Sequence, residues 1–273
     1  LWQNTLPEKL VNNRVKVTLS GNVYDRTRVL PNNGGYYRSS DNAILWDKNT
    51  TDNLNEMVPG AEGRISFAVG SVSGVKSLKN PYIDIHVSMS GDRSGADQST
   101  VSSTQDITVK FSSQIGIYAR SYRAVGPISN TGPIPPRAEK ESTYAIAWGI
   151  TNTTNDVKDA IVTATLPAYV TWKGEYYPQN ESVSYDPDTR KITWNAGSVS
   201  SGVGFAFAPR TVTFKVGVTP SVTNVGNILE ILSATSVSAT DTFTSKKLIS
   251  GASPANTRFS DPSFKTGDDT VVK

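Results

Sequence analysis

His86 is the only histidine in the chain, and its neighbours include the residue types of a hydrolytic triad. Polar and apolar residues alternate from Tyr82 to Ser88, so Asp84, His86 and Ser88 share one face of a predicted strand. A triad requires nucleophile, base and acid to converge on one reacting atom, whereas side chains on a flat strand face are splayed apart. We therefore predict that His86 faces solvent or a neighbouring module, and that the protein is not an enzyme.

Metal ligands are sparse. Asp186, Asp188 and Asp241 supply oxygen atoms, but their spacing matches no recognised calcium loop, and Asp186-Pro187-Asp188 is typical of a turn. The chain has no cysteine, which excludes a thiolate zinc site. We predict no cofactor and no metal, with a Ca²⁺ ion held between modules as the open alternative.

Aromatic residues in the second half of the chain could stack on a sugar ring. The candidates are Trp172, Tyr176, Tyr177, Tyr185 and Trp194. Alternation turns Tyr185 and Trp194 towards a core, which leaves Tyr176 and Tyr177 as the exposed candidates for ligand or subunit contact. Most aromatic side chains in sandwiches belong to the core, so the binding interpretation is the minority one.

Three Asn-X-Ser/Thr triplets are candidate glycosylation sites. Their acceptors are Asn49, Asn152 and Asn180. In a chain rich in threonine and asparagine such triplets arise easily by chance.

The stretch from Glu141 to Val218 predicts one complete β-sandwich module. Apolar residues alternate over 144–150 and again over 212–218, which indicates strands with one buried face. The turn at residues 186–189 lies between two further apolar runs and is typical of a hairpin.

The first half of the chain repeats features of this module in the same order. Ile44–Asp47 resembles Ile192–Asn195, and Ile65–Gly70 resembles Val212–Gly217. The spacings agree as well: Trp46 lies 21 residues before Phe67 and Trp194 lies 20 before Phe214, while Trp2 lies 13 before Val15 and Trp148 lies 13 before Ile161. These matches predict a duplicated module with Trp46 and Trp194 buried at equivalent positions.

We therefore expect an all-β protein of two tandem Ig-like β-sandwich domains. The first covers residues 1–124 and the second covers residues 140–249. Residues 125–139 form a Pro/Gly-rich linker, which proline should make semi-rigid. Residues 250–273 form an extended C-terminal tail.

The first domain is predicted to lack most of its opening strand. Trp148 lies six residues into a strand that begins near Ser142, whereas its counterpart Trp2 has only Leu1 before it. A missing strand leaves unpaired backbone groups and an uncovered strip of core.

Another segment must then fill the gap. We expect the tail of one subunit, with Val271 and Val272, to pack beside Trp2 of the next subunit. Addition of a strand to the sheet is one form that this contact can take. Such head-to-tail contacts do not close and generate fibres. The alternative is that residues upstream of Leu1 form the strand but are cleaved or unresolved.

Composition excludes several classes of protein. The net charge is +3 without a basic stripe, which gives nucleic-acid binding little support. No apolar run approaches the roughly 20 residues that span a bilayer. The first residues lack the features of a signal peptide, so an export signal of a secreted protein would lie upstream.

Seven segments of the second half carry a resemblance to a known family. They are Gly132–Pro136, Tyr144–Trp148, Thr151–Thr153, Ala164–Pro167, Val170–Trp172, Ile192–Trp194 and Ala239–Asp241. From about Gly132 to Ile249 the chain resembles the "conserved repeat domain" family of bacterial cell-surface proteins. The resemblance implies Ig-like sandwich modules in an exported, envelope-associated protein, and it does not imply an enzyme.

Our leading hypothesis is a structural protein that assembles head to tail into an extracellular filament or surface layer, with copies of itself as partners. One alternative is an adhesin or glycan-binding module with a surface glycan or host-cell partner, served by Tyr176 and Tyr177 or by an exposed loop over Gly91–Ser103. Another is an accessory region of a larger secreted hydrolase.

Overall fold

The computed structural model describes residues 1–72, 74, 78–95 and 98–273, which form two compact units, Leu1–Phe111 and Ser112–Lys273. Both units are built from antiparallel strands, and the described residues contain no α-helix, only short 3₁₀ turns such as Asp52–Leu54 and Val222–Asn224. The predicted all-β sandwich class is confirmed.

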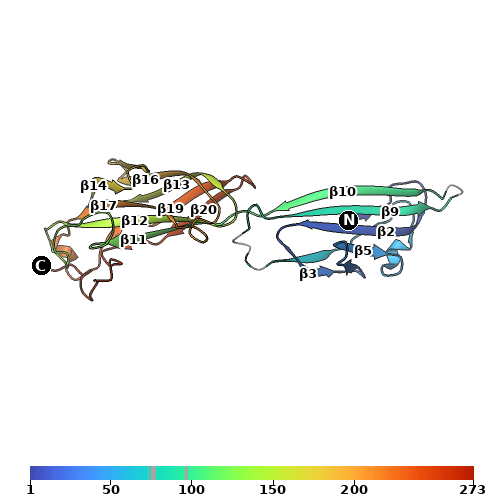
Figure 1. Cartoon of the computed structure of the whole chain (residues 1–273), viewed down its shortest axis with the longest axis horizontal. Coiled ribbons are helices and arrows are strands. Elements are labelled where there is room, and N and C mark those ends of the chain that lie inside the picture. The colour runs from blue at the N-terminus through green and yellow to red at the C-terminus, as the bar shows by residue number, and fades with distance from the viewer. Residues whose placement is uncertain (73, 75–77, 96–97) are drawn as a thin grey trace. The chain divides into compact units, whose positions relative to one another are not determined.

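The first unit has one large sheet in the order β10-β9-β2-β5-β4, with β6 also pairing with β2 (Figure 1). Two short pairs, β1–β7 and β3–β8, complete the unit. Its strands are β1 (Trp2–Gln3), β2 (Leu10–Gly21), β3 (Tyr24–Pro31), β4 (Tyr36–Arg38), β5 (Ala43–Asp47), β6 (Glu56–Met57), β7 (Glu62–Gly63), β8 (Phe67–Ser71), β9 (Tyr82–Arg93) and β10 (Thr100–Lys110).

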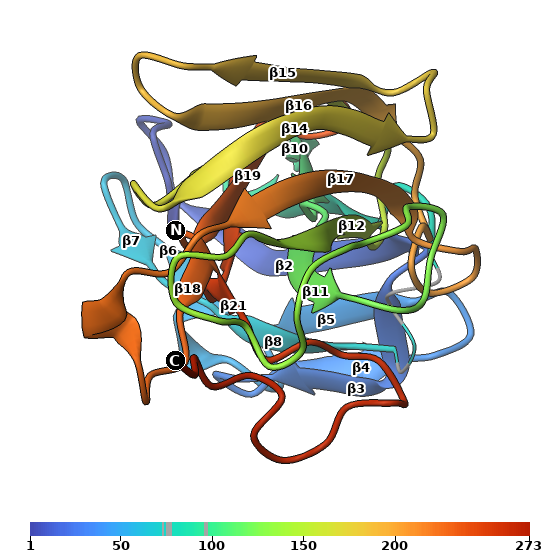
Figure 2. The same cartoon turned by 90° about the vertical axis from the view of Figure 1, so that its left-hand side faces the viewer.

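The second unit has sheets in the orders β11-β12-β17-β14 and β15-β16-β13-β19-β20, plus the pair β18–β21 (Figure 2). Its strands are β11 (Ile115–Tyr122), β12 (Ser142–Asn152), β13 (Val157–Thr165), β14 (Val170–Tyr177), β15 (Ser182–Asp186), β16 (Lys191–Val199), β17 (Arg210–Val218), β18 (Glu230–Leu232), β19 (Thr235–Asp241), β20 (Lys247–Ala252) and β21 (Ala255–Asn256).

Apart from β6, the large sheet of the first unit has the same topology as the five-stranded sheet of the second unit. The strand order β4-β5-β2-β9-β10 of the first unit matches the order β15-β16-β13-β19-β20 of the second, strand for strand. In the opposite layer β3 pairs with β8 as β14 pairs with β17, and the β1–β7 pair matches the contact of β12 with β17. This correspondence supports the predicted duplication.

The β4–β5 and β15–β16 hairpins agree in detail. Each turn ends on a non-glycine residue with positive φ, Asn42 at 51° and Arg190 at 56°. The carbonyl of each accepts a bond of 2.9 Å from the backbone N–H of a leucine, Leu19 for Asn42 and Leu166 for Arg190. The same turn therefore fixes the register of both sheets.

Trp46 and Trp194 are both fully buried, as predicted. Trp46 lies opposite Val15 in its sheet, and Trp194 lies opposite Val162. The two indoles therefore occupy equivalent places, next to a buried valine of the neighbouring strand.

The predicted alignment of the strands beside these tryptophans was wrong by one residue, because Val15 corresponds to Val162 and not to Ile161. A register shift interrupts both strands just before the valine. Asn12 and Asp159 take positive φ values of 53° and 55° at these shifts, three residues before their valines. Because both strands have this bulge at the same place, the extra residue lies before it: Asn12 follows Trp2 by 10 residues, whereas Asp159 follows Trp148 by 11.

The boundary between the units also differs from the predicted one. β11 pairs along its length with β12, so the second unit begins at Ser112 and not after residue 124. Residues 125–139 are folded onto this unit and are not a free linker. Ile128 is buried, and the buried Arg123 guanidinium donates to the carbonyls of Thr131 and Gly132.

The segment 250–273 closes its own unit, so the prediction that it packs on another subunit was wrong. β21 pairs with β18, and Phe259 and Val271 are buried. The backbone of Val272 bonds to Pro136 and Ala138. These apolar residues find a core within the same chain, which removes the reason for donation.

Candidate functional site

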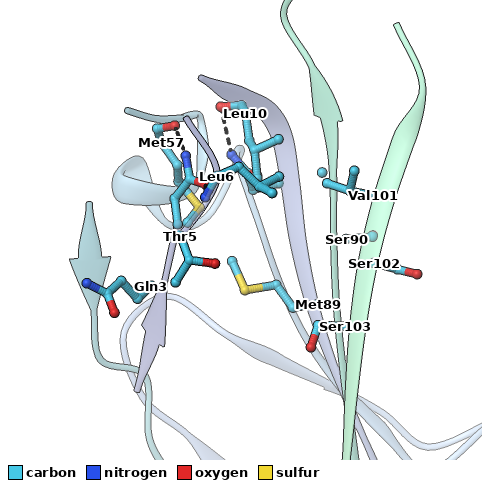
Figure 3. Close-up of a pocket in the computed structure, with 13 residues that line it drawn as sticks. Gln3, Thr5, Leu6, Leu10, Met57, Met89, Ser90, Val101, Ser102 and Ser103 are labelled. Carbon is cyan, nitrogen blue, oxygen red and sulfur yellow. Dashed lines mark hydrogen bonds between the residues drawn. The ribbon is translucent and has the colours of Figure 1, made fainter. Parts of the chain in front are cut away.

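The first unit has an open apolar groove between its N-terminal segment and the β9–β10 hairpin. Two adjoining cavities of about 270 and 470 Å³ share Gln3, Met89 and Ser103 in their walls. Figure 3 shows the smaller one, with Gln3 and Thr5 on one side and Met89 and Ser103 on the other. The larger one reaches the core at Trp46. Among the described residues that line either cavity, none has a charged side chain.

The groove is open because the inner face of β10 is uncovered. Ile107 and Val109 lie opposite Ile85 and Ile83 of β9, so all four side chains point to the interior face of the sheet. Yet Ile107 is 47% exposed and Val109 is 40% exposed, and Phe111, just beyond the strand, is 37% exposed. The alternation thus marks a core-facing row that has no cover.

In the second unit β11 supplies the cover that the first unit lacks. It pairs with β12 on one side and contacts β19 and β20 on the other. Ile115 is buried, and Ile117 and Ala119 pack against the core. Val237 is consequently fully buried, whereas its counterpart Met89 is partly exposed. In the described part of the first unit, no strand takes the place of β11.

One wall of the groove presents backbone groups as well as apolar side chains. Trp2 pairs with Gly63, and the N–H of Asn4 donates to the carbonyl of Ala61, so these residues turn their backbone towards β7. Alternation along an extended segment turns the N–H and C=O of Gln3 to the opposite edge. An apolar trough with a strand edge along one wall is suited to receive an extended peptide.

Of the individual residues predicted to make contacts, Trp2 belongs to this groove. The predicted contact loop Gly91–Ser103 also contributes to it, through Gly91, Val101, Ser102 and Ser103. Trp2 is partly buried and packs against the first-unit core, with Gly63 beneath its indole ring. Sequence reasoning missed Met89, Ile107 and Val109. Their signal was the regular alternation in β9 and β10, but alternation does not tell whether the row is covered.

The groups of the suspected triad are not brought together. His86 and Asp84 lie on the outer face of the β9–β10 hairpin and pair across strands. Nδ1 of His86 lies 2.6 Å from Oδ1 of Asp106, and the Thr108 hydroxyl donates to Asp84 over 2.5 Å. This polar ladder is solvent-exposed and faces away from the groove.

We expect His86→Ala to leave the thermal unfolding temperature unchanged within error, because its partner Asp106 is 81% exposed and exposed ion pairs contribute little. Thermal unfolding followed by circular dichroism measures this, with Thr108→Ala as a neighbouring control. A large loss in His86→Ala alone would show that this ladder has a role we have not assigned.

Tyr176 and Tyr177 do not form a joint platform. They are neighbours on β14 and point to opposite faces, Tyr176 against the core and Tyr177 into solvent. Trp172 stacks on Tyr185 with ring centroids 5.8 Å apart, and both rings are partly buried.

The predicted loop over Gly91–Ser103 is mostly strand, because β9 continues to Arg93 and β10 begins at Thr100. Residues 96 and 97 lie outside the described part of the chain.

The candidate glycosylation sites differ in access. Asn49 and Asn180 are exposed, but Asn152 is fully buried. Its amide donates to three carbonyls, those of Asn155, Val199 and Ser200. Asn152 is therefore not an accessible acceptor in the folded protein, and that part of the prediction was wrong.

The aspartates do not gather into a metal site. Asp186 accepts from the backbone of Asp188 and the hydroxyl of Thr189, as in a turn, and Asp241 is buried in a separate network. Over the described ranges, no three His, Cys, Asp or Glu residues are placed to hold a metal ion. Nor does any helix there have the length and apolarity to cross a membrane.

No family model and no curated protein matches the sequence. Solved structures with similarity include the C-terminal domain of the AgI/II polypeptide BspA from Streptococcus agalactiae, with 10% identity, a TM-score of 0.31, and 89% of this chain and 84% of that chain covered. BcpA, the major pilin subunit of Bacillus cereus, has 11% identity and a TM-score of 0.35, with 89% of this chain and 69% of that chain covered. The major pilin SpaD from Corynebacterium diphtheriae has 10% identity and a TM-score of 0.32, with 90% of this chain and 59% of that chain covered. These scores are low, so the groove alone carries the functional proposal.

Proposed function

We propose that the protein is a non-catalytic structural building block of the bacterial cell surface, joined to its neighbours through the groove of the first unit. Copies linked in this way would form an extracellular filament or surface layer. The observation that carries the proposal is the uncovered groove, whose counterpart in the second unit is closed by β11.

The groove offers a physical reason for association. Burying apolar surface contributes about 25 cal/mol per Å², and Ile107, Val109 and Phe111 expose such surface in one row. β10 is also an edge strand of 11 residues, and unpaired strand edges are templates for pairing with another chain. A groove on the first unit that meets a different surface on the next copy makes a contact that propagates.

The adhesin alternative has less support. Of the tyrosines proposed to bind sugar, only Tyr177 is exposed, at 54%, and a single ring is a small platform. A catalytic role for His86 has no assembled constellation in the described residues, because His86 and its neighbours are paired across strands on a flat face. The alternative of an accessory region of a larger secreted hydrolase needs no such constellation in this chain.

Electron microscopy and light scattering of the purified protein test the proposal. We expect concentration-dependent polymers from the unchanged chain and their loss in Ile107→Lys, because a buried unpaired charge in the groove is strongly unfavourable. Thr108→Lys is the matched control, since this neighbouring side chain lies on the outer face and should not impair polymers. A chain that stays monomeric at all concentrations, or polymers that survive Ile107→Lys, would contradict the proposal.

A further inference from the structure

We propose that the groove of the first unit accepts an extended β-strand with the chemistry of β11, running antiparallel to β1. This inference concerns the chemistry of the strand and does not rest on the proposed function, which concerns its source. Its physical basis is the duplication, because the second unit shows the same place in the same topology already occupied.

The pattern of the incoming strand follows from β11. Its inward positions are Ile115, Ile117, Ala119 and Ser121, all uncharged, whereas Arg120 is exposed. The described walls of the groove also have no charged side chain, so a charged inward side chain would be desolvated and would have no side-chain partner of opposite charge there. The strand is therefore expected to carry uncharged, mostly apolar residues at every second position.

The register of the strand follows from the tryptophans. In the second unit Trp148 of β12 lies opposite Ala119 of β11. Trp2 is the counterpart of Trp148, and it lies in the wall of the larger cavity. A small residue is therefore expected opposite Trp2, because the indole fills the space that a larger side chain would need.

The length of the strand is set by the wall that it follows. Residues 1–6 all line one cavity or the other. Extended residues advance by about 3.3 Å each, so a strand of about six residues spans this wall. The segment 250–273 is not the donor, because its apolar residues are packed in their own unit.

The chain contains no cysteine, which permits disulfide trapping of the strand in the groove. The full chain carries Gln105→Cys, at an inward-facing position of β10 that lines the larger cavity. The probe is a synthetic peptide with the sequence of residues 113–123, in which a cysteine replaces either the inward Ala119 or the outward Arg120. The peptide cysteine is activated as a mixed disulfide with an aromatic thiol, which the thiolate of the protein displaces.

We expect the peptide with the inward cysteine to form the disulfide at least about tenfold faster than the peptide with the outward cysteine, because only the inward thiol faces the groove. A tenfold difference corresponds to a preference of about 1.4 kcal/mol. Adding Ile107→Lys should abolish this preference, whereas Thr108→Lys should retain it. Equal rates for the two peptides, or no trapping at all, would overturn the inference. Trapping by a chain that never polymerises would uphold the inference and overturn only the proposed function.

Discussion

Trp194→Ala is expected to lower the free energy of unfolding of the second unit by about 3–5 kcal/mol. The indole is fully buried and lies between Val162 and Val183 of the two neighbouring strands. Its N–H donates to Glu181 over 2.8 Å, and Glu181 in turn pairs with Arg210. Truncation leaves a cavity and removes a hydrogen-bond donor from a partly buried carboxylate. Urea unfolding followed by circular dichroism measures the loss.

Tyr177→Ala serves as the control, because its side chain is mostly in solvent and its loss should be small. Trp46→Ala should cost the first unit a comparable amount, since its indole occupies the equivalent place and donates to the Asn32 carbonyl over 2.7 Å. A loss below about 1 kcal/mol in either tryptophan variant would contradict the assignment of these residues as module centres.

The sequence predicted strands and modules well because alternation reports directly which face of a strand is buried. It placed Trp46 and Trp194 correctly for that reason. It misaligned Val15 because the stretch from Trp148 to the bulge at Asp159 is one residue longer than the stretch from Trp2 to the bulge at Asn12. Period two gives the face of a strand but not the length of the connection before it.

Strand partners were harder to predict than strands. The residues of β11 were assigned to the first domain, because an alternating sequence pattern predicts a strand but does not indicate which strand it pairs with. The last residues were taken for an extended tail because the alternating pattern fades after Ile249, although Phe259 and Val271 lie among them. Each fills a gap in a core built by distant strands, and that is a property of the tertiary structure only.

An uncovered strip of core in the first unit was predicted, and the structure has an open strip between β1 and β10. Its lining could not be predicted, because Ile107 and Val109 have the pattern of fully buried residues. Their exposure depends on a strand that is absent from the described first unit, and a sequence pattern does not report missing neighbours.

Asp241→Ala is the other substitution with a large expected effect, a loss of at least about 3 kcal/mol in the second unit, because each buried group left unpaired costs about 1–3 kcal/mol. The carboxylate is fully buried. It accepts four hydrogen bonds of 2.7–2.9 Å, from the backbone of Ser113, Phe243 and Thr244 and from the Asn155 amide. The Ser113 bond also fixes the chain just before β11.

The pH dependence of stability separates this charge from simple packing. Burial pushes the pKa of Asp241 upwards, but the bonds from Ser113, Asn155, Thr244 and Phe243 together hold it below its ordinary value. A carboxyl whose pKa is lower in the folded state stabilises the fold fully above its unfolded pKa of about 3.9. That contribution is lost as the pH falls through the folded pKa.

We therefore expect the urea midpoint of the second unit to decrease as the pH is lowered from roughly 6 to roughly 2, a range that brackets that pKa. The decrease should be smaller in Asp241→Asn. The amide keeps the shape of the carboxyl but does not titrate. Asp188→Asn is the matched control, because this exposed turn residue should leave the dependence unchanged. Equal slopes for the unchanged chain and Asp241→Asn would show that the buried carboxylate does not contribute as a charge.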